Sequence, residues 1–151
     1  MTRDRKERDM MLDSTELVQE AVRAADAAYC PYSRFQVGAA VVGDDGKIYT
    51  GCNIENASFG LTNCAERTAI FKAVSAGCRA IRALAVAGGT PEQPASPCGA
   101  CRQVMAEFGK ADLPVSITDR DGKQIRTVTL GDLLPLSFSL DDAKAPDTPT
   151  A

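Results

Sequence analysis

Three segments of the chain repeat apolar residues at the spacing of an α-helix. The first predicted helix begins near Ser14 and ends before Pro31, with apolar positions at Leu17, Ala21, Ala24 and Ala28. The second begins near Cys64 and stops at Gly77, with Ala65, Ala69, Ala73 and Ala76 on its apolar side. The third ends at Gly109, and its apolar stripe consists of Cys101, Val104, Met105 and Phe108.

Five short runs predict β-strands. Residues 36–42 alternate apolar and polar positions, and a turn over 43–46 returns the chain as a second strand over 47–52. Residues 81–87 form an apolar run typical of a buried strand, and two further strands are expected over 114–118 and 123–129. A short helical turn over 132–134 is expected to close the domain.

The order of these elements is helix, two strands, helix, strand, helix, two strands. It predicts the fold class α/β, with a single mixed sheet packed between helices. The length of 151 residues suits one compact domain, which we place at 14–142. Residues 1–13 are an expected charged arm, because seven consecutive residues from Arg3 to Asp9 are charged. Residues 143–151 are an expected flexible tail, polar and interrupted by prolines.

The composition excludes several classes of function. The net charge is −3, and this lack of a basic excess argues against a nucleic-acid partner. The longest plainly apolar stretch, residues 37–42, is far too short to span a bilayer, so no membrane partner is expected. The N-terminus is charged rather than apolar, so no secretory signal is predicted and the expected location is cytoplasmic.

Two residue counts narrow the chemistry. Histidine is absent, which removes histidine general bases, Ser-His and Cys-His nucleophile pairs, and histidine metal ligands. Cysteine numbers six. In a reducing compartment these cysteines are expected to be ligands, nucleophiles or buried apolar residues rather than disulfides.

Three of the cysteines stand where the second and third predicted helices begin. A Cys-x-x-Cys pair on a first helical turn, here Cys98 and Cys101, brings two sulfurs to one point. Cys64 at the start of another helix can meet them there. Three protein ligands leave the fourth position of zinc open for water, which is typical of a catalytic site. The spacing therefore favours one Zn²⁺ per chain.

The neighbouring residues support such a site. Asn63 and Ser96 are the expected N-caps of the two helices, and Pro97 would take the first helical position. Three thiolates around Zn²⁺ leave excess negative charge, which two positive helix N-termini offset. Arg67 lies on the same helical face as Cys64 and can donate to the sulfurs from behind them.

Glu66 is the expected proton carrier, since the chain has no histidine. Each residue alone also has a plainer interpretation. The Cys-x-x-Cys pair could be a thioredoxin-like redox pair, and Cys64 a small buried residue. Glu66 could be a capping carboxylate for Asn63, and Arg67 a surface residue. The joint pattern is more specific, because Cys-x-Glu followed by Pro-Cys-x-x-Cys matches a three-cysteine variant of the zinc-dependent nucleobase deaminase signature.

Four stretches, over 30–40, 51–57, 63–69 and 96–104, resemble the small homotetrameric cytidine deaminases with three-cysteine zinc sites. The resemblance implies a three-layer α/β/α fold with one mixed five-stranded sheet. It implies zinc-dependent hydrolytic deamination of cytidine and 2′-deoxycytidine to uridine and 2′-deoxyuridine, with release of ammonia, in pyrimidine salvage. It further implies a homotetramer with sites completed by neighbouring subunits. By the same resemblance Cys64, Cys98 and Cys101 ligate zinc, and Glu66 is the acid–base.

The resemblance also implies contacts to the nucleoside. Asn53 and Glu55 match the residues that hold the sugar 3′-hydroxyl, and lying two apart after a strand they can face the same side. Phe35 matches the residue beside the pyrimidine, and Ala65 should offer backbone groups to the base. Phe138 matches an aromatic that packs onto the base from a neighbouring subunit. Without the family, the first pair would be a polar turn and both phenylalanines ordinary core.

Rival functions stay open on the sequence. A deaminase of a modified nucleoside, such as the blasticidin S deaminases, shares the zinc pattern. A structural zinc module would need a fourth sulfur, from Cys52 or Cys78, and a redox protein would form a reversible disulfide without metal. Phe59 stands where many relatives have tyrosine, which puts a polar contact there in doubt. Cys30, Cys52 and Cys78 are expected to be small, partly buried residues.

Overall fold

The computed structural model describes residues 14–140, so the expected arm over 1–13 and tail over 143–151 lie outside the described residues. Five strands form one sheet in the order β2-β1-β3-β4-β5. Only the β3–β4 pair is parallel, and the other neighbours are antiparallel, which confirms the predicted mixed sheet. The strands are β1 (Gly38–Gly43), β2 (Ile48–Cys52), β3 (Ile81–Ala87), β4 (Pro114–Thr118) and β5 (Ile125–Thr129).

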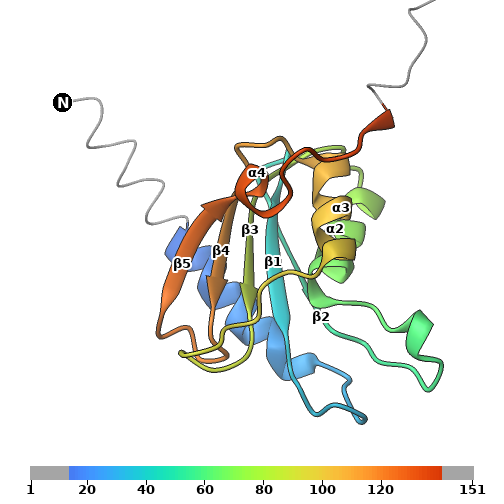
Figure 1. Ribbon diagram of the computed structural model, residues 1–151, viewed down its shortest axis with the longest axis vertical. Helices are drawn as coiled ribbons and strands as arrows, with labels where there is room; N and C mark the ends of the chain where they lie inside the picture. The colour runs from blue at the N-terminus through green and yellow to red at the C-terminus, as the bar shows by residue number, and fades with distance from the viewer. Residues whose placement is uncertain (1–13, 141–151) are drawn as a thin grey trace, which may run out of the picture.

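Helices cover both faces of this sheet (Figure 1). The N-terminal helix spans residues 14–24 and continues into the 3-10 turn η1 (Ala25–Ala27). On the opposite face lie α2 (Ala65–Ser75), α3 (Gly99–Phe108) and the short α4 (Leu130–Leu133). The arrangement is the three-layer α/β/α fold that the resemblance implied.

Alternation along the strands explains why both faces are buried. Ala39 and Val41 of β1 belong to the core cluster under α2 and α3. Ala40 between them belongs to the cluster under the N-terminal helix, with Leu17 and Val18. Successive side chains of a strand point to opposite faces, so a strand covered on both sides is apolar throughout.

Glycine allows α2 to lie close against β2. A Cβ at Gly51 would stand 2.5 Å from the backbone nitrogen of Ala69 and 2.8 Å from the carbonyl of Ala65, both in α2. At the other end of α2, Gly77 adopts φ 111°, and the N–H groups of Gly77 and Cys78 donate to carbonyls of the last turn. This left-handed cap ends the helix as predicted.

Two short elements differ from the sequence-based expectation. The turn η2 (Phe59–Leu61) was not predicted. The closing turn was expected over 132–134, but α4 begins at Leu130 because Thr129 and Asp132 form a reciprocal capping box.

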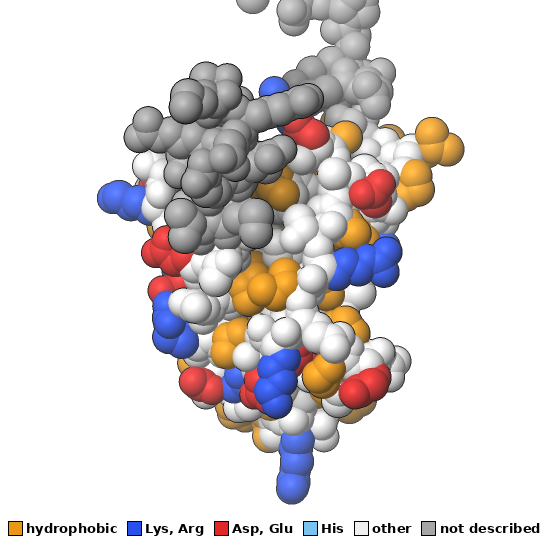
Figure 2. All heavy atoms as spheres, turned by 90° about the vertical axis from the view of Figure 1, so that its left-hand side faces the viewer, with side chains coloured by type: hydrophobic (Ala, Val, Ile, Leu, Met, Phe, Trp, Pro, Cys, Tyr) orange, Lys and Arg blue, Asp and Glu red, His pale blue; other side chains and the backbone are white. Residues whose placement is uncertain are grey.

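The surface does not carry one dominant charge on the face that Figure 2 displays, where acidic and basic side chains are interspersed. Among the helices of residues 14–140, none combines the length and the apolar character needed to cross a bilayer.

Candidate active site

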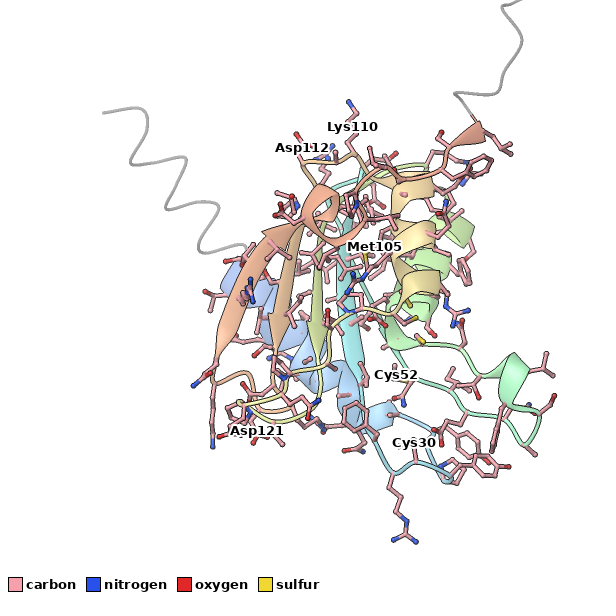
Figure 3. All side chains as sticks on the ribbon, viewed as in Figure 1. Cys30, Cys52, Met105, Lys110, Asp112 and Asp121 are labelled. Atoms are coloured by element: carbon pink, nitrogen blue, oxygen red, sulfur yellow. The ribbon has the colours of Figure 1, made fainter. Side chains whose placement is uncertain are left out.

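The three expected sulfurs come together where α2 and α3 begin. Cys64 is the N-cap of α2, Cys98 is the N-cap of α3, and Cys101 lies in the first turn of α3. Their sulfur atoms all lie within 4.8 Å of one another, and Cys64 Sγ is 3.8 Å from Cys98 Sγ. Figure 3 shows sulfur atoms gathered at these neighbouring helix ends. Residues 34 positions apart thus share one point in space.

The expected N-caps are wrong by one and two positions. The extended residues before the two helices are Cys64 and Cys98, neither of which caps through its side chain. Asn63 instead pairs its backbone with Ile54 and donates from its amide to Thr68 Oγ1 over 3.0 Å. Ser96 accepts from Arg102 over 3.1 Å, so Pro97 precedes the helix rather than opening it. The cysteine sulfurs are therefore free of capping bonds.

The sulfur geometry fits a zinc ion. A tetrahedral site with Zn–S bonds of about 2.3 Å has S···S edges of about 3.8 Å, which equals the Cys64–Cys98 separation. All three donors are thiols at helix N-termini, where the positive end of the backbone dipole favours thiolates. Among residues 14–140, no fourth cysteine, histidine or carboxylate joins this group.

Arg67 supplies positive charge beside the sulfurs, and the expected contact is present. Its NH2 donates to Cys64 Sγ over 3.4 Å. Interaction with the neighbouring Cys101 thiol, together with the Arg67 hydrogen bond, lowers the pKa of Cys64 to about 5. The neighbouring Cys64 sulfur and burial raise the pKa of Cys101. The Arg67 Nε is buried without a hydrogen-bond partner among the described residues.

Glu66 is buried against the sulfur group. Its residue is 4% exposed, and its Oε2 lies 3.6 Å from Cys101 Sγ, which donates to it. Burial raises the pKa of this carboxyl group. Because Glu66 points at a sulfur and Asn63 lies before the cap, the plainer interpretation as a capping carboxylate for Asn63 does not hold.

Backbone pairing brings the Asn53–Glu55 segment to the same place. Ile54 exchanges hydrogen bonds with Asn63 as an antiparallel bridge, and this register sets Asn53 beside Cys64. On its other side the segment pairs with Tyr29. The segment with the candidate sugar-binding residues is thus paired through its main chain with the residue that precedes Cys64.

Asn53 and Glu55 both face the segment over 32–37. The Asn53 amide donates to the Phe35 carbonyl over 2.7 Å and accepts from the Val37 N–H over 2.9 Å. Glu55 Oε1 accepts from the N–H groups of Tyr32 and Ser33 over 3.0 and 3.1 Å. Hydrogen bonds from the Ser33 side chain and from this backbone lower the pKa of Glu55. The side chains that could bind a sugar therefore also shape the loop around it.

A hollow of about 420 Å³ opens next to Glu55, not at the sulfurs themselves. Tyr32, Ser33, Glu55, Phe59 and Thr62 line it. Phe59 is 76% exposed, and its ring meets Tyr32 edge to face with centroids 6.0 Å apart. Apart from Glu55, none of these residues was predicted to line a substrate site.

The other three expected substrate contacts are differently exposed. Phe35 is 47% exposed rather than core. Phe138 is also exposed, and its carbonyl accepts from Gln103 of α3. Ala65 is fully buried at the start of α2. The two aromatic rings are available to a ligand, whereas Ala65 is covered in the single chain.

Arg102 stabilises the start of α3. No role was predicted for it from the sequence. Its guanidinium donates to the Pro97 carbonyl over 2.7 Å and to the Leu133 carbonyl of α4 over 2.8 Å. The third contact is Ser96 Oγ. These bonds hold the chain leading into Cys98 against α3 and α4.

The remaining cysteines lie outside the sulfur group. Cys78 is buried beside the β1–β2 turn, and Cys30 and Cys52 are partly buried, as expected. All six cysteines are free thiols. Neither Cys52 nor Cys78 supplies the fourth sulfur that a structural zinc module would need.

Comparison with known proteins gives matches over most of the chain. The family model described as "Cytidine and deoxycytidylate deaminase zinc-binding region" matches residues 11–117. A cytidine deaminase of Sporosarcina psychrophila is 53% identical over 131 residues, covering 87% of this chain and 95% of the relative.

Solved structures agree with the sequence matches. A crystal structure of cytidine deaminase from Burkholderia pseudomallei has a TM-score of 0.76 and 54% identity, covering 82% of this chain and 97% of that one. The cytidine deaminase of Mycobacterium tuberculosis has a TM-score of 0.73 and 45% identity, covering 85% and 98%. With all three cysteines and Glu66 inside the matched zinc-binding region, the chain belongs to the cytidine and deoxycytidylate deaminase family.

Proposed function

We propose that this protein is a zinc-dependent hydrolase that deaminates cytidine and 2′-deoxycytidine to uridine and 2′-deoxyuridine, with release of ammonia. The observation that carries the proposal is the contact between buried Glu66 and Cys101 within a group of three sulfurs. Relatives named cytidine deaminase, at up to 53% identity, support the same substrate class.

Cys64, Cys98 and Cys101 would hold one Zn²⁺ per chain, leaving a fourth position open. When bound, zinc supplies Lewis acidity that lowers the pKa of water from roughly 15.7 to about 7. Three thiolates donate electron density to zinc and weaken its Lewis acidity. Arg67 donates a hydrogen bond to Cys64 Sγ and so reduces the electron density that this sulfur would give to the metal.

Glu66 moves the protons. Its carboxylate accepts a proton from the water that adds to C4 of the pyrimidine, and delivers one to N3. It then takes the second water proton from the new hydroxyl at C4 and passes it to the 4-amino group, so that the C4 carbonyl forms as the C4–N bond breaks and ammonia leaves. Cytidine and water thus become uridine and ammonia, and the carboxylate is restored. Burial next to Cys101 holds the carboxylate where these transfers occur.

The proposed nucleoside contacts surround this centre. Glu55 would accept from the sugar 3′-hydroxyl at the hollow it lines, with Asn53 beside it. Phe35 would pack beside the pyrimidine, and Ala65 would offer backbone groups to the base. Phe138 would close a neighbouring subunit's site in the homotetramer that we propose from the family. Exposure of Phe35 and Phe138 supports these two contacts.

We propose a cytoplasmic location, which the unpaired thiols of Cys30, Cys52 and Cys78 support because such thiols persist in a reducing compartment. We propose 14–142 as the deaminase domain, with 1–13 and 143–151 as appended segments. Pyrimidine salvage would be the role of the reaction.

A direct assay tests the function. Purified protein is given cytidine or deoxycytidine while ultraviolet absorbance and ammonia are followed together, beside Glu66→Ala. We expect ammonia from wild type alone, with one zinc per chain in both proteins. A folded wild type that binds zinc but releases no ammonia would point to a modified nucleoside such as blasticidin S. A silent protein that binds no zinc and forms a reversible Cys98–Cys101 disulfide would be a redox protein.

A further inference from the structure

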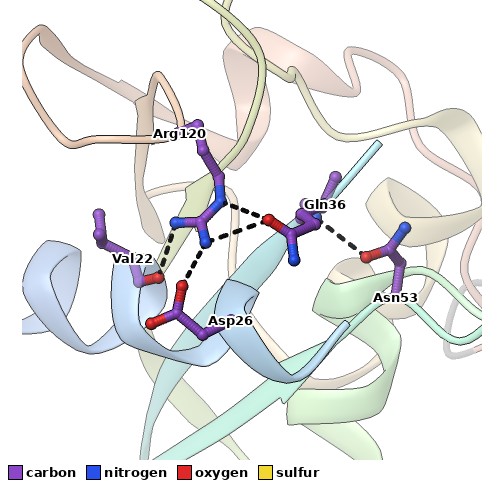
Figure 4. A network of polar contacts seen from close by, with 6 residues as sticks. Val22, Asp26, Gln36, Asn53 and Arg120 are labelled. Carbon is purple, nitrogen blue, oxygen red and sulfur yellow. Dashed lines mark hydrogen bonds and ion pairs between the residues drawn. The ribbon is translucent and has the colours of Figure 1, made fainter. Parts of the chain in front are cut away.

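A polar network connects the N-terminal helix with the segment that carries Phe35. Figure 4 shows Arg120, which follows β4, between that helix and Gln36. Arg120 NH1 donates to the Val22 carbonyl over 3.1 Å, and NH2 forms an ion pair with Asp26. Nε and NH2 both donate to Gln36 Oε1, over 3.4 and 3.3 Å. One guanidinium therefore joins three segments that are far apart in the sequence.

Arg120 is itself firmly placed. Its backbone N–H donates to the Gly89 carbonyl over 3.0 Å, and Gly88 donates to the Thr118 carbonyl over 3.1 Å. The Arg120 side chain is only 26% exposed. The guanidinium thus projects from a hydrogen-bonded part of the fold rather than from a free loop.

The segment next to Gln36 needs such support. Arg34 adopts φ 56°, a left-handed conformation that costs energy for a residue with a side chain. Immediately after it, the Phe35 carbonyl and the Val37 N–H are both held by the Asn53 amide. Figure 4 shows Arg120 and Asn53 on opposite sides of Gln36. Asn53 therefore holds the backbone on either side of Gln36, and Arg120 holds the Gln36 side chain from the other side.

We propose that Arg120 and Gln36 are positioning residues of the substrate site, which together hold the 35–37 backbone so that Phe35 is presented to the nucleoside. This inference rests on the proposed function, because Phe35 is the aromatic assigned to the pyrimidine. Arginine suits the task because its planar fork reaches three acceptors at once, which the single ammonium of lysine does not. Neither residue touches the sulfurs or Glu66, so the network acts on binding rather than on proton transfer.

Steady-state kinetics separate these effects. Gln36→Leu and Arg120→Met are each expected to raise KM about three- to tenfold, with kcat within about twofold of wild type. Gln36→Glu keeps an oxygen facing Arg120 and should retain the wild-type KM. The double variant Gln36→Leu/Arg120→Met should be no worse than Arg120→Met alone, because loss of the guanidinium already removes the bonds to Gln36. Arg23→Met is the control and should keep the wild-type KM. This exposed arginine lies in the N-terminal helix, next to Val22, and pairs with Glu20 rather than with Gln36.

The kinetic outcomes that would overturn the inference are definite. They are a wild-type KM in folded Gln36→Leu, equal KM values for the Leu and Glu variants, or additive effects in the double variant. Gln36 is exposed, so its variants should fold even where Arg120→Met does not.

A second measurement does not depend on turnover. The chain contains no tryptophan, so Phe35→Trp installs a single tryptophan on the positioned segment, which excitation at wavelengths beyond tyrosine absorption observes alone. In that background, Gln36→Leu should increase quenching of the tryptophan by acrylamide, whereas Gln36→Glu should not. Equal quenching in both would refute the positioning role. An inactive wild type would instead refute the proposed function, while the fluorescence result would still decide the role of Gln36.

Discussion

The Cys101 thiol donates to Glu66 Oε2 over 3.6 Å, although the two residues lie on different helices and 35 positions apart. Both residues are buried, so the carboxylate and the Cys101 sulfur meet where solvent is largely excluded. This contact joins the candidate metal centre to the candidate proton carrier.

Glu66→Gln should lower kcat by about 10²- to 10⁴-fold, because an amide of the same shape neither accepts nor delivers the proton. Zinc should stay at one per chain, since Glu66 is not among the three grouped ligands. Ammonia release and metal analysis of the same preparation check both statements. Glu107→Gln, an exposed position on α3, is the matched control and should be fully active. Zinc loss in Glu66→Gln would show that the carboxylate supports the metal instead.

Arg67→Gln should reduce activity about tenfold or more while weakening zinc binding less, because the guanidinium donates to Cys64 Sγ without being a ligand. Arg67→Lys keeps the charge and should recover part of the activity. Competition with a chromogenic chelator gives the zinc affinity beside the kinetic constants. Full activity in Arg67→Gln would remove the proposed charge-balancing role.

Removal of zinc with a chelator should abolish turnover reversibly and leave the secondary structure in place. The reason is that the core clusters on both sides of the sheet are apolar and contain no other grouped metal ligands among residues 14–140. Circular dichroism before and after chelation, with re-addition of zinc, makes the comparison. We also expect a lower melting temperature without metal, because the ion binds only the folded state. Loss of the helical signal on chelation would instead assign the zinc a structural role.

Gly51→Ala should destabilise the protein by about 1–3 kcal/mol, because the new Cβ would lie 2.5 Å from a backbone nitrogen of α2. Pushing α2 from β2 also moves Cys64 and Glu66, so activity should fall with stability. Gly60→Ala is the matched control, since nothing lies within 4 Å of a Cβ there and its φ is not positive. Urea unfolding of both variants measures the difference. Equal midpoints would mean that the α2–β2 approach is not as tight as described.

Local patterns were sufficient for the elements of the fold. The strands over 81–87 and 114–118 were predicted to the residue, the first from its apolar run and the second from its place before the Asp121-Gly122 turn. The helix that begins near Cys64 and stops at Gly77 was predicted from apolar residues at helical spacing and from the glycine. Such signals depend on residues within a few positions of one another.

The N-caps of α2 and α3 were not predicted correctly from local patterns. Asn63 has the side chain of an N-cap, but Ile54 and Thr68 engage it, and the cap falls on Cys64. Whether a polar side chain bonds its own helix or a distant segment depends on what the fold brings next to it.

The sequence by itself determined the order of helices and strands, the three-cysteine pattern and the carboxylate two residues after the first of those cysteines. The tertiary structure alone decided that these groups meet, that Asn53 and Glu55 hold the 32–37 segment, and that Arg120 reaches Gln36. The physical reason is range. Hydrophobic periodicity acts within one helix or strand, whereas hydrogen bonds between residues 84 positions apart exist only after the sheet and its helices have packed.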